Sequence, residues 1–203
     1  VLSMTDVRGD LSNLLRRLIG ANIKLNMIHG RDLGLVRADQ GQVEQVIINL
    51  AVNARDAMPQ GGRLSISVSP CAFDASSDPR MAQAGEGEFV RLTITDSGCG
   101  MNEDTLEHMF EPFFTTKEVG KGTGLGLSTV YGIVKQHEGW IDVVSAPGQG
   151  TTFTIIMRAT DAAAEDHVVA APRVIGAEAV GGERAAELRK RNDGDVVPHA
   201  LGL

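Results

Sequence analysis

The residues VEQVIINLAVNARDAM, at positions 43–58, decide how the rest of the chain is interpreted. Their apolar side chains recur at intervals of three and four residues, and no glycine or proline interrupts them before Pro59. This spacing predicts a helix with one buried face, and Asp39 is a suitable N-cap for it. The predicted buried positions are Val43, Val46, Ile47, Leu50, Ala54, Ala57 and Met58.

A second, polar strip runs along the same predicted helix. At roughly 100° per residue, Asn49, Asn53 and Asp56 fall within about 60° of one another and about a quarter-turn from the apolar face. Asn and Asp are poor helix formers because their short polar groups compete for the backbone, so the strip needs a reason. It is either a solvated flank or a lining of amides and a carboxylate for a cavity that holds a polar ligand or a cation.

The bulk composition is that of an ordinary globular protein, with 42% hydrophobic and 22% charged residues among 203. The net charge of -7 argues against nucleic acid or an anionic membrane surface as a partner bound by charge alone. Cys71 and Cys99 form neither a metal-ligand spacing nor a disulfide framework, which suits a reducing cytosol. We expect a monomeric, cytoplasmic chain without direct membrane contact, whether or not its parent protein is membrane-anchored.

Periodicity predicts a mixed order of elements around the central helix. The predicted helices are 11–19, 43–58 and 125–136, and the predicted strands are 23–28, 33–37, 64–68, 89–96, 140–145 and 151–157. Residues 70–87 read as a polar loop. From Ala159 onward the composition shifts to Ala, Val, Gly and charged residues without a sustained period, which predicts a tail or linker.

One predicted strand ends on a carboxylate that points inward. In FVRLTITD, at 89–96, Asp96 continues the phase of Val90, Leu92 and Ile94. Burying it unpaired costs several kcal/mol, so it needs a donor from the protein or from a ligand. Thr151 likewise points inward. A satisfied structural Asp at a strand end is the alternative explanation.

A glycine-rich turn, GKGTGLG at 120–126, comes just before the helix predicted at 125–136. Glycines that open onto a helix N-terminus favour an anion site, because free backbone N–H groups and the positive end of the dipole point outward. A flexible hinge is the alternative. Residues 101–122 have weak periodicity, and a connection this long is usually a lid or a disordered segment.

Taken in order, five motifs of the chain resemble those of the catalytic, ATP-binding domain of sensor histidine kinases, in the superfamily that also contains gyrase, Hsp90 and MutL. NLAVNARDAM (49–58) resembles the N box, DSGCGM (96–101) the first glycine box, FEPFFTTK (110–117) the F box, GKGTGLGL (120–127) the second glycine box and GQGTTF (148–153) the third. The resemblance covers about residues 10–158. The residues NARDAM and EPFFTTK within these motifs are similar to those of the nitrogen-regulation and hybrid sensor kinases. It implies an α+β fold, a two-layer α/β sandwich of the Bergerat type with a mixed β-sheet packed on helices, in a domain at 1–158 followed by a tail at 159–203.

The resemblance also implies a role for each motif. Asp96 would accept from the adenine amine, with a bridging water on Thr151, and Asn53 would bind Mg²⁺. Met101, Leu106 and Phe110 would wall the base or pack the lid. The implied ATP-binding residues are Asn49, Asn53, Arg55, Asp96, Gly98, Gly100, Met101, Phe110, Thr116, Lys117, Gly122, Thr123, Gly124, Leu125, Gly126, Leu127 and Thr151, of which Asn53 and Lys117 would be catalytic.

The implied function is to bind Mg-ATP and donate its γ-phosphate to a histidine on a dimerisation domain that this chain lacks, in two-component signalling. None of the 5 histidines has the sequence context of the family's phosphoacceptor. A response regulator or receiver domain would be the downstream partner. Two positions depart from relatives: Asp56 stands where many kinases have Lys or Arg, and Asn49 where the chaperone and gyrase branch has a glutamate base. An ATPase clamp, which Asn49 argues against, and a regulatory nucleotide-binding module are the alternatives.

Overall fold

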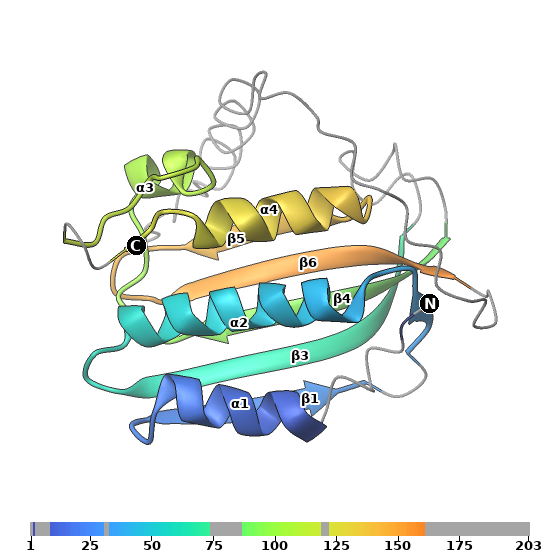
Figure 1. Cartoon of the computed structure of the whole chain (residues 1–203), viewed down its shortest axis with the longest axis horizontal. Coiled ribbons are helices and arrows are strands. Elements are labelled where there is room, and N and C mark those ends of the chain that lie inside the picture. The colour runs from blue at the N-terminus through green and yellow to red at the C-terminus, as the bar shows by residue number, and fades with distance from the viewer. Residues whose placement is uncertain (1, 3–8, 31–32, 74–86, 119–121, 161–203) are drawn as a thin grey trace, which may run out of the picture.

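The computed structural model describes residues 2, 9–30, 33–73, 87–118 and 122–160 of the chain. In this part of the chain, helices cover one face of a mixed six-stranded sheet (Figure 1). The described helices are α1 (Gly9–Ile19), α2 (Gln40–Ala57), α3 (Glu103–His108) and α4 (Gly126–Gln136). The described strands are β1 (Ile23–His29), β2 (Leu35–Val36), β3 (Gly62–Phe73), β4 (Gly87–Asp96), β5 (Trp140–Ser145) and β6 (Thr151–Thr160). The predicted two-layer sandwich is confirmed.

The sheet is mixed because β1 pairs with β3 in parallel, whereas the other pairings are antiparallel. The strand order is β1-β3-β4-β6-β2, and β5 pairs with the first part of β6. The register places Asp96 of β4 between Leu64 of β3 and Thr151 of β6. The two inward polar residues found in the sequence are therefore neighbours in the sheet.

Helix α2 is central to the helical layer, since it lies between α1 and α4 and contacts both (Figure 1). Its expected N-cap is confirmed, because the Asp39 carboxylate accepts the backbone N–H of Gln42 at 2.9 Å. The buried residues of α2 are Val43, Val46, Ile47, Leu50, Ala51 and Ala54. They belong to one core with apolar side chains of β3, β4 and β6, so the apolar face of α2 fixes where its polar strip points.

A histidine joins α2 to α4. His137 follows the last residue of α4, and its Nε2 accepts the backbone N–H of Asp39 at 3.1 Å. Its Nδ1 lies 2.9 Å from the carbonyl oxygen of Ile133 and therefore carries the proton that it donates there. The imidazole thus ties the C-terminus of α4 to the N-terminus of α2.

Two strands extend into the segment that the sequence predicts as a loop. β3 continues to Phe73 and pairs with β4 from Gly87, although residues 70–87 show only a polar pattern. Pro70 is tolerated because β1 ends opposite Val68, so β3 needs no N–H on that side beyond this point. β6 also runs two residues past the predicted domain end, to Thr160, because Ala159 and Thr160 pair with β2. The rest of the predicted tail, 161–203, lies outside the described residues.

The segment predicted as a lid contains a short helix that the sequence analysis missed. In α3 the Asn102 side chain accepts the backbone N–H of Thr105 at 2.9 Å and caps the first turn. None of its six residues is buried, so an apolar period could not reveal it. Met109 and Phe110, just beyond it, are buried in the core, and the Phe110 ring lies 5.3 Å from that of Tyr131. Phe110 thus contacts α4 through Tyr131, and its expected role, to wall the base or pack the lid, stays a prediction.

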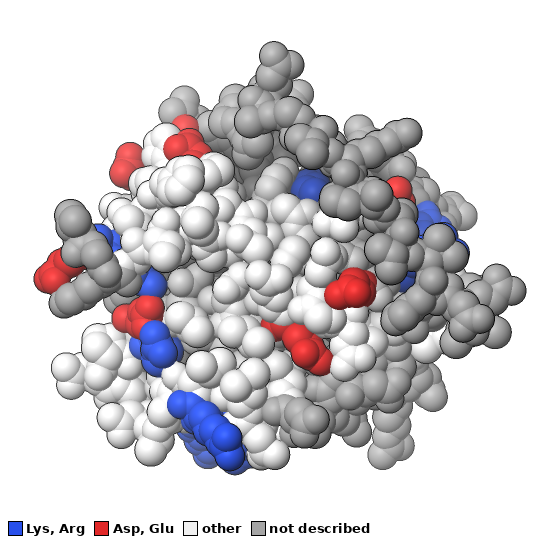
Figure 2. All heavy atoms as spheres, in the orientation of Figure 1, with Lys and Arg blue, Asp and Glu red and all other residues white. Residues whose placement is uncertain are grey.

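The surface over the described helices carries charged side chains of both signs, scattered over a mostly uncharged face (Figure 2). Within the described part of the chain, no helix is both long enough and apolar enough to cross a membrane.

Candidate nucleotide-binding site

The carboxylate of Asp96 is buried at the end of β4, with 7% of the residue exposed. Its Oδ1 accepts the backbone N–H of Gly98 at 2.8 Å, and the backbone amide of Thr151 also donates to it. Burial raises the pKa of this carboxyl, the two backbone amides lower it, and the net shift is upward. Asp96 is therefore an acceptor in an environment that does not favour its negative charge. A further N–H donor, such as one from a ligand, would stabilise that charge.

Glycines in the turn after β4 allow the backbone to pass close to this carboxylate and to a neighbouring turn. A Cβ on Gly98 would lie 2.8 Å from Asp96 Oδ1 and 2.7 Å from the carbonyl oxygen of Ala57, so only glycine fits. Gly100 has a φ of +67°, and a Cβ there would meet the carbonyl of Ala146. The backbone N–H of Cys99 donates to the Ala57 carbonyl at 3.0 Å, which fastens this turn to the last residue of α2.

Ser145 organises the neighbourhood of Thr151, although the sequence analysis did not single it out. Its Oγ donates to the carbonyl of Gly150 at 2.9 Å and accepts the backbone N–H of Met101 at 2.8 Å. The Oγ1 of Thr151, a residue that is 6% exposed, lies 3.0 Å from the same Oγ. Because the Ser145 proton is used on Gly150, Thr151 donates to Ser145 and keeps its own lone pairs for another donor. Ser145 shares the phase of Ile141 and Val143, and that alternation could have found it.

The side-chain amide of Asn53, on α2, lies near the start of α4. Asn49 and Asn53 are both half-buried, and a Cβ on Gly126 would lie 3.8 Å from Asn53 Nδ2. The first N–H groups of a helix have no partner within it. In the described part of the chain, the N-cap residue of α4, Leu125, makes no side-chain capping bond to them. Asn53 therefore lies beside an N-terminus suited to an anion, which favours the cavity-lining explanation of the polar strip.

The second glycine-rich turn packs on the F-box segment. The backbone N–H of Phe113 donates to the carbonyl of Gly124 at 2.9 Å, and both residues have positive φ. A Cβ on Gly122 would lie 2.7 Å from the Oγ1 of Thr115, so the two segments are in close contact. Of the predicted site residues here, Thr116, Thr123 and Leu125 are exposed. Residues 119–121, which include the first two residues of the second glycine box, lie outside the described residues.

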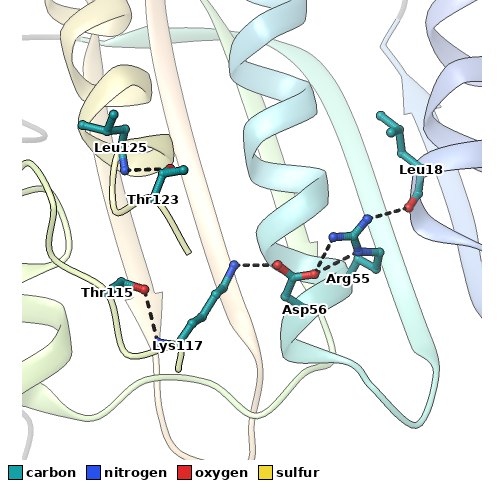
Figure 3. Close-up of polar contacts among 7 residues, drawn as sticks. All are labelled: Leu18, Arg55, Asp56, Thr115, Lys117, Thr123 and Leu125. Atoms are coloured by element: carbon teal, nitrogen blue, oxygen red, sulfur yellow. Dashed lines mark hydrogen bonds and ion pairs between the residues drawn. The ribbon is translucent and has the colours of Figure 1, made fainter. Parts of the chain in front are cut away.

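Lys117 and Arg55, the two cationic side chains among the predicted site residues, both contact the carboxylate of Asp56, the last residue of the polar strip. Lys117 Nζ lies 2.5 Å from Asp56 Oδ2, and Arg55 donates to Asp56 Oδ1 from Nη2 at 2.7 Å (Figure 3). Arg55 also donates from Nη1 to the carbonyl oxygen of Leu18, in the last turn of α1, at 3.2 Å. Its guanidinium is therefore directed toward α1, and its role as a phosphate contact stays a prediction.

Residues 38–161 match the model of one protein family, the histidine kinase-, DNA gyrase B- and HSP90-like ATPases. The chain belongs to this family. Over 157 residues it is 52% identical to the sensor kinase CckA of Brucella abortus, covering 77% of this chain and 17% of that protein. It is 39% identical over 133 residues to the sensor histidine kinase ZraS of Escherichia coli K12, covering 66% and 25% of the two chains. The chain thus spans a quarter or less of the length of these relatives.

Solved structures of the same family share its fold. The catalytic domain of the histidine kinase ThkA, nucleotide-free, has a TM-score of 0.58 at 26% identity and covers 78% of this chain and 93% of that domain. Full-length ShkA in complex with AMPPNP has a TM-score of 0.60 at 25% identity, over 80% of this chain and 31% of that one. These likenesses support the fold expected for a histidine kinase catalytic domain.

The family's sequence motifs meet at one end of α2 in this chain. Gly98 touches Ala57, and Gly126 lies near Asn53, one turn earlier in the helix. Four residues along a helix correspond to about 6 Å, so the inward carboxylate and the α4 N-terminus border the same short stretch of α2. Phe110 is linked to α4 by its ring contact with Tyr131.

Proposed function

We propose that this chain binds Mg-ATP and donates the γ-phosphate to a histidine on a separate dimerisation domain. Membership of an ATPase family implies ATP as the ligand. One observation carries the proposal: the final turn of α2 lies close to the turn after the buried Asp96 carboxylate at one end and to the N-terminus of α4 at the other. An adenine needs the first feature and a polyphosphate needs the second.

The chain's own residues divide the nucleotide between them in this proposal. Asp96 accepts from the adenine amine, and Thr151 offers lone pairs to a bridging water. The first turn of α4, with Gly122 to Leu127, donates backbone N–H groups to phosphate oxygens, and Asn49 contacts them from α2. Backbone N–H groups and a side-chain amide release no proton to phosphate at neutral pH, so these groups position the phosphates rather than react with them.

Asn53 fits a hard cation, because its side-chain oxygen is the kind of ligand that Mg²⁺ takes and the neighbouring α4 N-terminus would hold the phosphates that supply other ligands. A bound Mg²⁺ would supply positive charge that offsets the negative charge developing during transfer. Asn53 would hold that ion, and Lys117 would add positive charge from the F-box segment.

The acceptor in this proposal is a histidine outside the chain, followed by a response regulator or receiver domain. Among the described histidines, His108 pairs with Glu111 at 2.8 Å, and His137 bonds the backbone of α2 and α4. Hydrolysis by an activated water is disfavoured, because Asn49 replaces the acidic residue that would take the proton. A regulatory module that binds ATP without transferring phosphate is the competing function.

Phosphotransfer can be tested with radiolabelled ATP and two separate proteins: this chain, and a dimerisation fragment from its own parent protein that carries the histidine. We expect label on the fragment, in a bond lost in acid and kept in base, and little hydrolysis by the chain alone. The in-line geometry of transfer has to come from docking of the two. The Asn53→Ala chain serves as the control without metal ligation. Tight ATP binding without transfer would favour the regulatory module, and rapid hydrolysis by the isolated chain would favour the ATPase clamp.

A further inference from the structure

Four groups from three parts of the fold form one continuous chain of polar contacts. It runs from Lys117, after α3, through Asp56 and Arg55 in the last turn of α2, to the carbonyl of Leu18 in α1 (Figure 3). The contacts are 2.5 Å, 2.7 Å and 3.2 Å long in that order. Asp56 is the one anion among these four groups, and it lies between the two cations, Lys117 and Arg55.

The ammonium of Lys117 has two competing uses. The proposed function needs its charge near the nucleotide phosphates, whereas in this structure it is bonded to the Asp56 carboxylate. An ammonium can hold both anions only if they come close together, and their like charges then repel each other. Binding of a polyphosphate near Lys117 must therefore weaken or break its contact with Asp56.

We propose that Asp56 is an internal counter-ion that holds Lys117 in the free protein and competes for it with the phosphates of the nucleotide. The site then binds ATP by exchanging one anion for another on the same ammonium. This inference rests on the proposed function, because it requires phosphates beside the F-box segment. It gives the acidic residue at this position a role in setting nucleotide affinity.

Arg55 makes the exchange possible without leaving a bare carboxylate. It donates to Asp56 Oδ1 from both Nε, at 2.9 Å, and Nη2, at 2.7 Å, so Asp56 keeps a charge-assisted partner when Lys117 leaves. The side chains of Lys117 and Asp56 are 34% and 27% exposed, so water and a ligand can reach the pair. The Arg55 bond to Leu18 keeps the guanidinium on the side of Asp56 away from Lys117.

The titration of Asp56 agrees with this arrangement. Burial raises the pKa of its carboxyl, but the hydrogen bonds and positive charges of Lys117 and Arg55 outweigh burial and bring the pKa below its ordinary value. The free protein thus favours an ionised Asp56, which is the form that competes with phosphate.

The test is calorimetric titration of Mg-ATP and of adenosine into four chains: the parent, Asp56→Asn, Lys117→Met and the double variant. Asp56→Asn should bind Mg-ATP about 3- to 10-fold more tightly than the parent, since a partly exposed ion pair and a repulsion with phosphate both disappear. Its affinity for adenosine, which has no phosphates, should stay that of the parent. In the Lys117→Met background the same substitution should have an effect of less than about 2-fold, because most of the competition is gone.

Glu88→Gln is the matched control, because it removes one negative charge from an exposed residue at the far end of β4 from Asp96. Its affinity for Mg-ATP should equal that of the parent. If the parent binds Mg-ATP and Asp56→Asn binds it equally or more weakly, Asp56 is not a competing counter-ion. The proposed function would then remain intact. An equal gain in both backgrounds, or in Glu88→Gln, would also overturn it. Failure of every chain to bind Mg-ATP would overturn the proposed function and the exchange together.

Discussion

At the scale of single residues, the site uses a buried carboxylate that is poorly matched to its surroundings in the free protein. Asp96 has two backbone donors, yet burial dominates and raises its pKa. A residue placed there for stability alone would more easily be neutral, because burying charge is costly. The mismatch is consistent with a group kept for a ligand that brings its own donor.

Substituting Asp96 by Asn tests that role. An Asn turns one acceptor oxygen into a donor, so it loses the charged hydrogen bond to the adenine amine, worth about 1.5 to 3 kcal/mol. We expect Asp96→Asn to bind ATP more weakly by that amount in calorimetry. GTP, which presents a carbonyl where adenine has its amine, should bind poorly to the parent. Equal affinities of the parent for ATP and GTP would show that Asp96 does not read the base.

The raised pKa of Asp96 also predicts how stability depends on pH. The folded chain binds this proton more tightly than the unfolded chain, in which the carboxyl has its ordinary pKa near 3.8. The resulting stability is therefore fully present below about pH 4 and is lost as the pH rises through the raised pKa. The free energy of unfolding in urea should be measured for the parent and for Asp96→Asn across this pH range. As the pH rises through the raised pKa, the parent should lose stability relative to Asp96→Asn, and the difference should then level off. A difference that is constant with pH, or that shifts the other way, would contradict the buried charge.

Sequence alternation was enough to predict Asp96 and Thr151, because a strand places every second side chain on one face. It was not enough for the partners of Lys117. Asp56 precedes Lys117 by 61 positions, and only the tertiary packing of α2 against the F-box segment brings the two together. Arg55 shows the same limit, since its contact with Leu18 depends on how α1 packs on α2.

At the scale of elements, α2 connects the two halves of the site, which are the surroundings of Asp96 and the N-terminus of α4. Its apolar face packs in the core, so Asn53 is held facing the start of α4 and Ala57 touches Gly98. A helix that is buried along one side is rigid, and the spacing between the two halves is therefore set by backbone geometry rather than by side-chain rotamers.

The metal role of Asn53 can be separated from its place in α2. Asn53→Ala removes an oxygen ligand but keeps the apolar face intact, so the chain should fold and lose the tightening of ATP binding that Mg²⁺ produces. Asn49→Ala is the comparison on the same strip, and it should weaken ATP with and without Mg²⁺. The measurement is titration of ATP at several Mg²⁺ concentrations. If ATP binding by Asn53→Ala depends on Mg²⁺ as it does in the parent, the polar strip of α2 is only a solvated flank.

The histidine that joins α2 to α4 should matter for stability and not for ligand binding. His137→Ala leaves the Asp39 N–H and the Ile133 carbonyl without this partner, which should cost about 1 kcal/mol in urea unfolding. The neighbouring exposed residue gives the control, Gln136→Ala, which should lie within about 0.5 kcal/mol of the parent. If the two variants are equally stable, the imidazole does not join the helices.

Elements with a strong period were predictable, and those stabilised by pairing or capping were not. The central helix and the strands at 89–96 and 151–157 show apolar spacing that any core of this kind requires. The extension of β3 past Pro70 depends on the end of β1, which no local pattern records. α3 depends on one capping side chain, Asn102, and buries none of its own residues.

At the scale of the whole molecule, the sandwich is anchored unevenly around the site. Met109 and Phe110 fasten the segment after α3 to the core. Beyond them, Phe113 is 74% exposed. The described contacts of residues 113–117 include a hydrogen bond from Phe113 to Gly124, a ring contact between Phe114 and His108, and the ion pair of Lys117 with Asp56. Few buried apolar contacts place residues 111–118 at the low-stability end of the domain.

This unevenness predicts which part of the expected lid responds to nucleotide. Hydrogen exchange followed by mass spectrometry should show fast exchange at 111–118 in the free chain and slower exchange with Mg-ATP, because phosphates would hold Lys117 and the first turn of α4. Residues 103–110 should change less, since core packing already holds Met109 and Phe110. Adenosine is the control, and it should protect residues near Asp96 without protecting 111–118. Exchange at 111–118 that is already slow without ligand, and unchanged by Mg-ATP, would mean that this segment is part of the rigid sandwich and does not act as a lid.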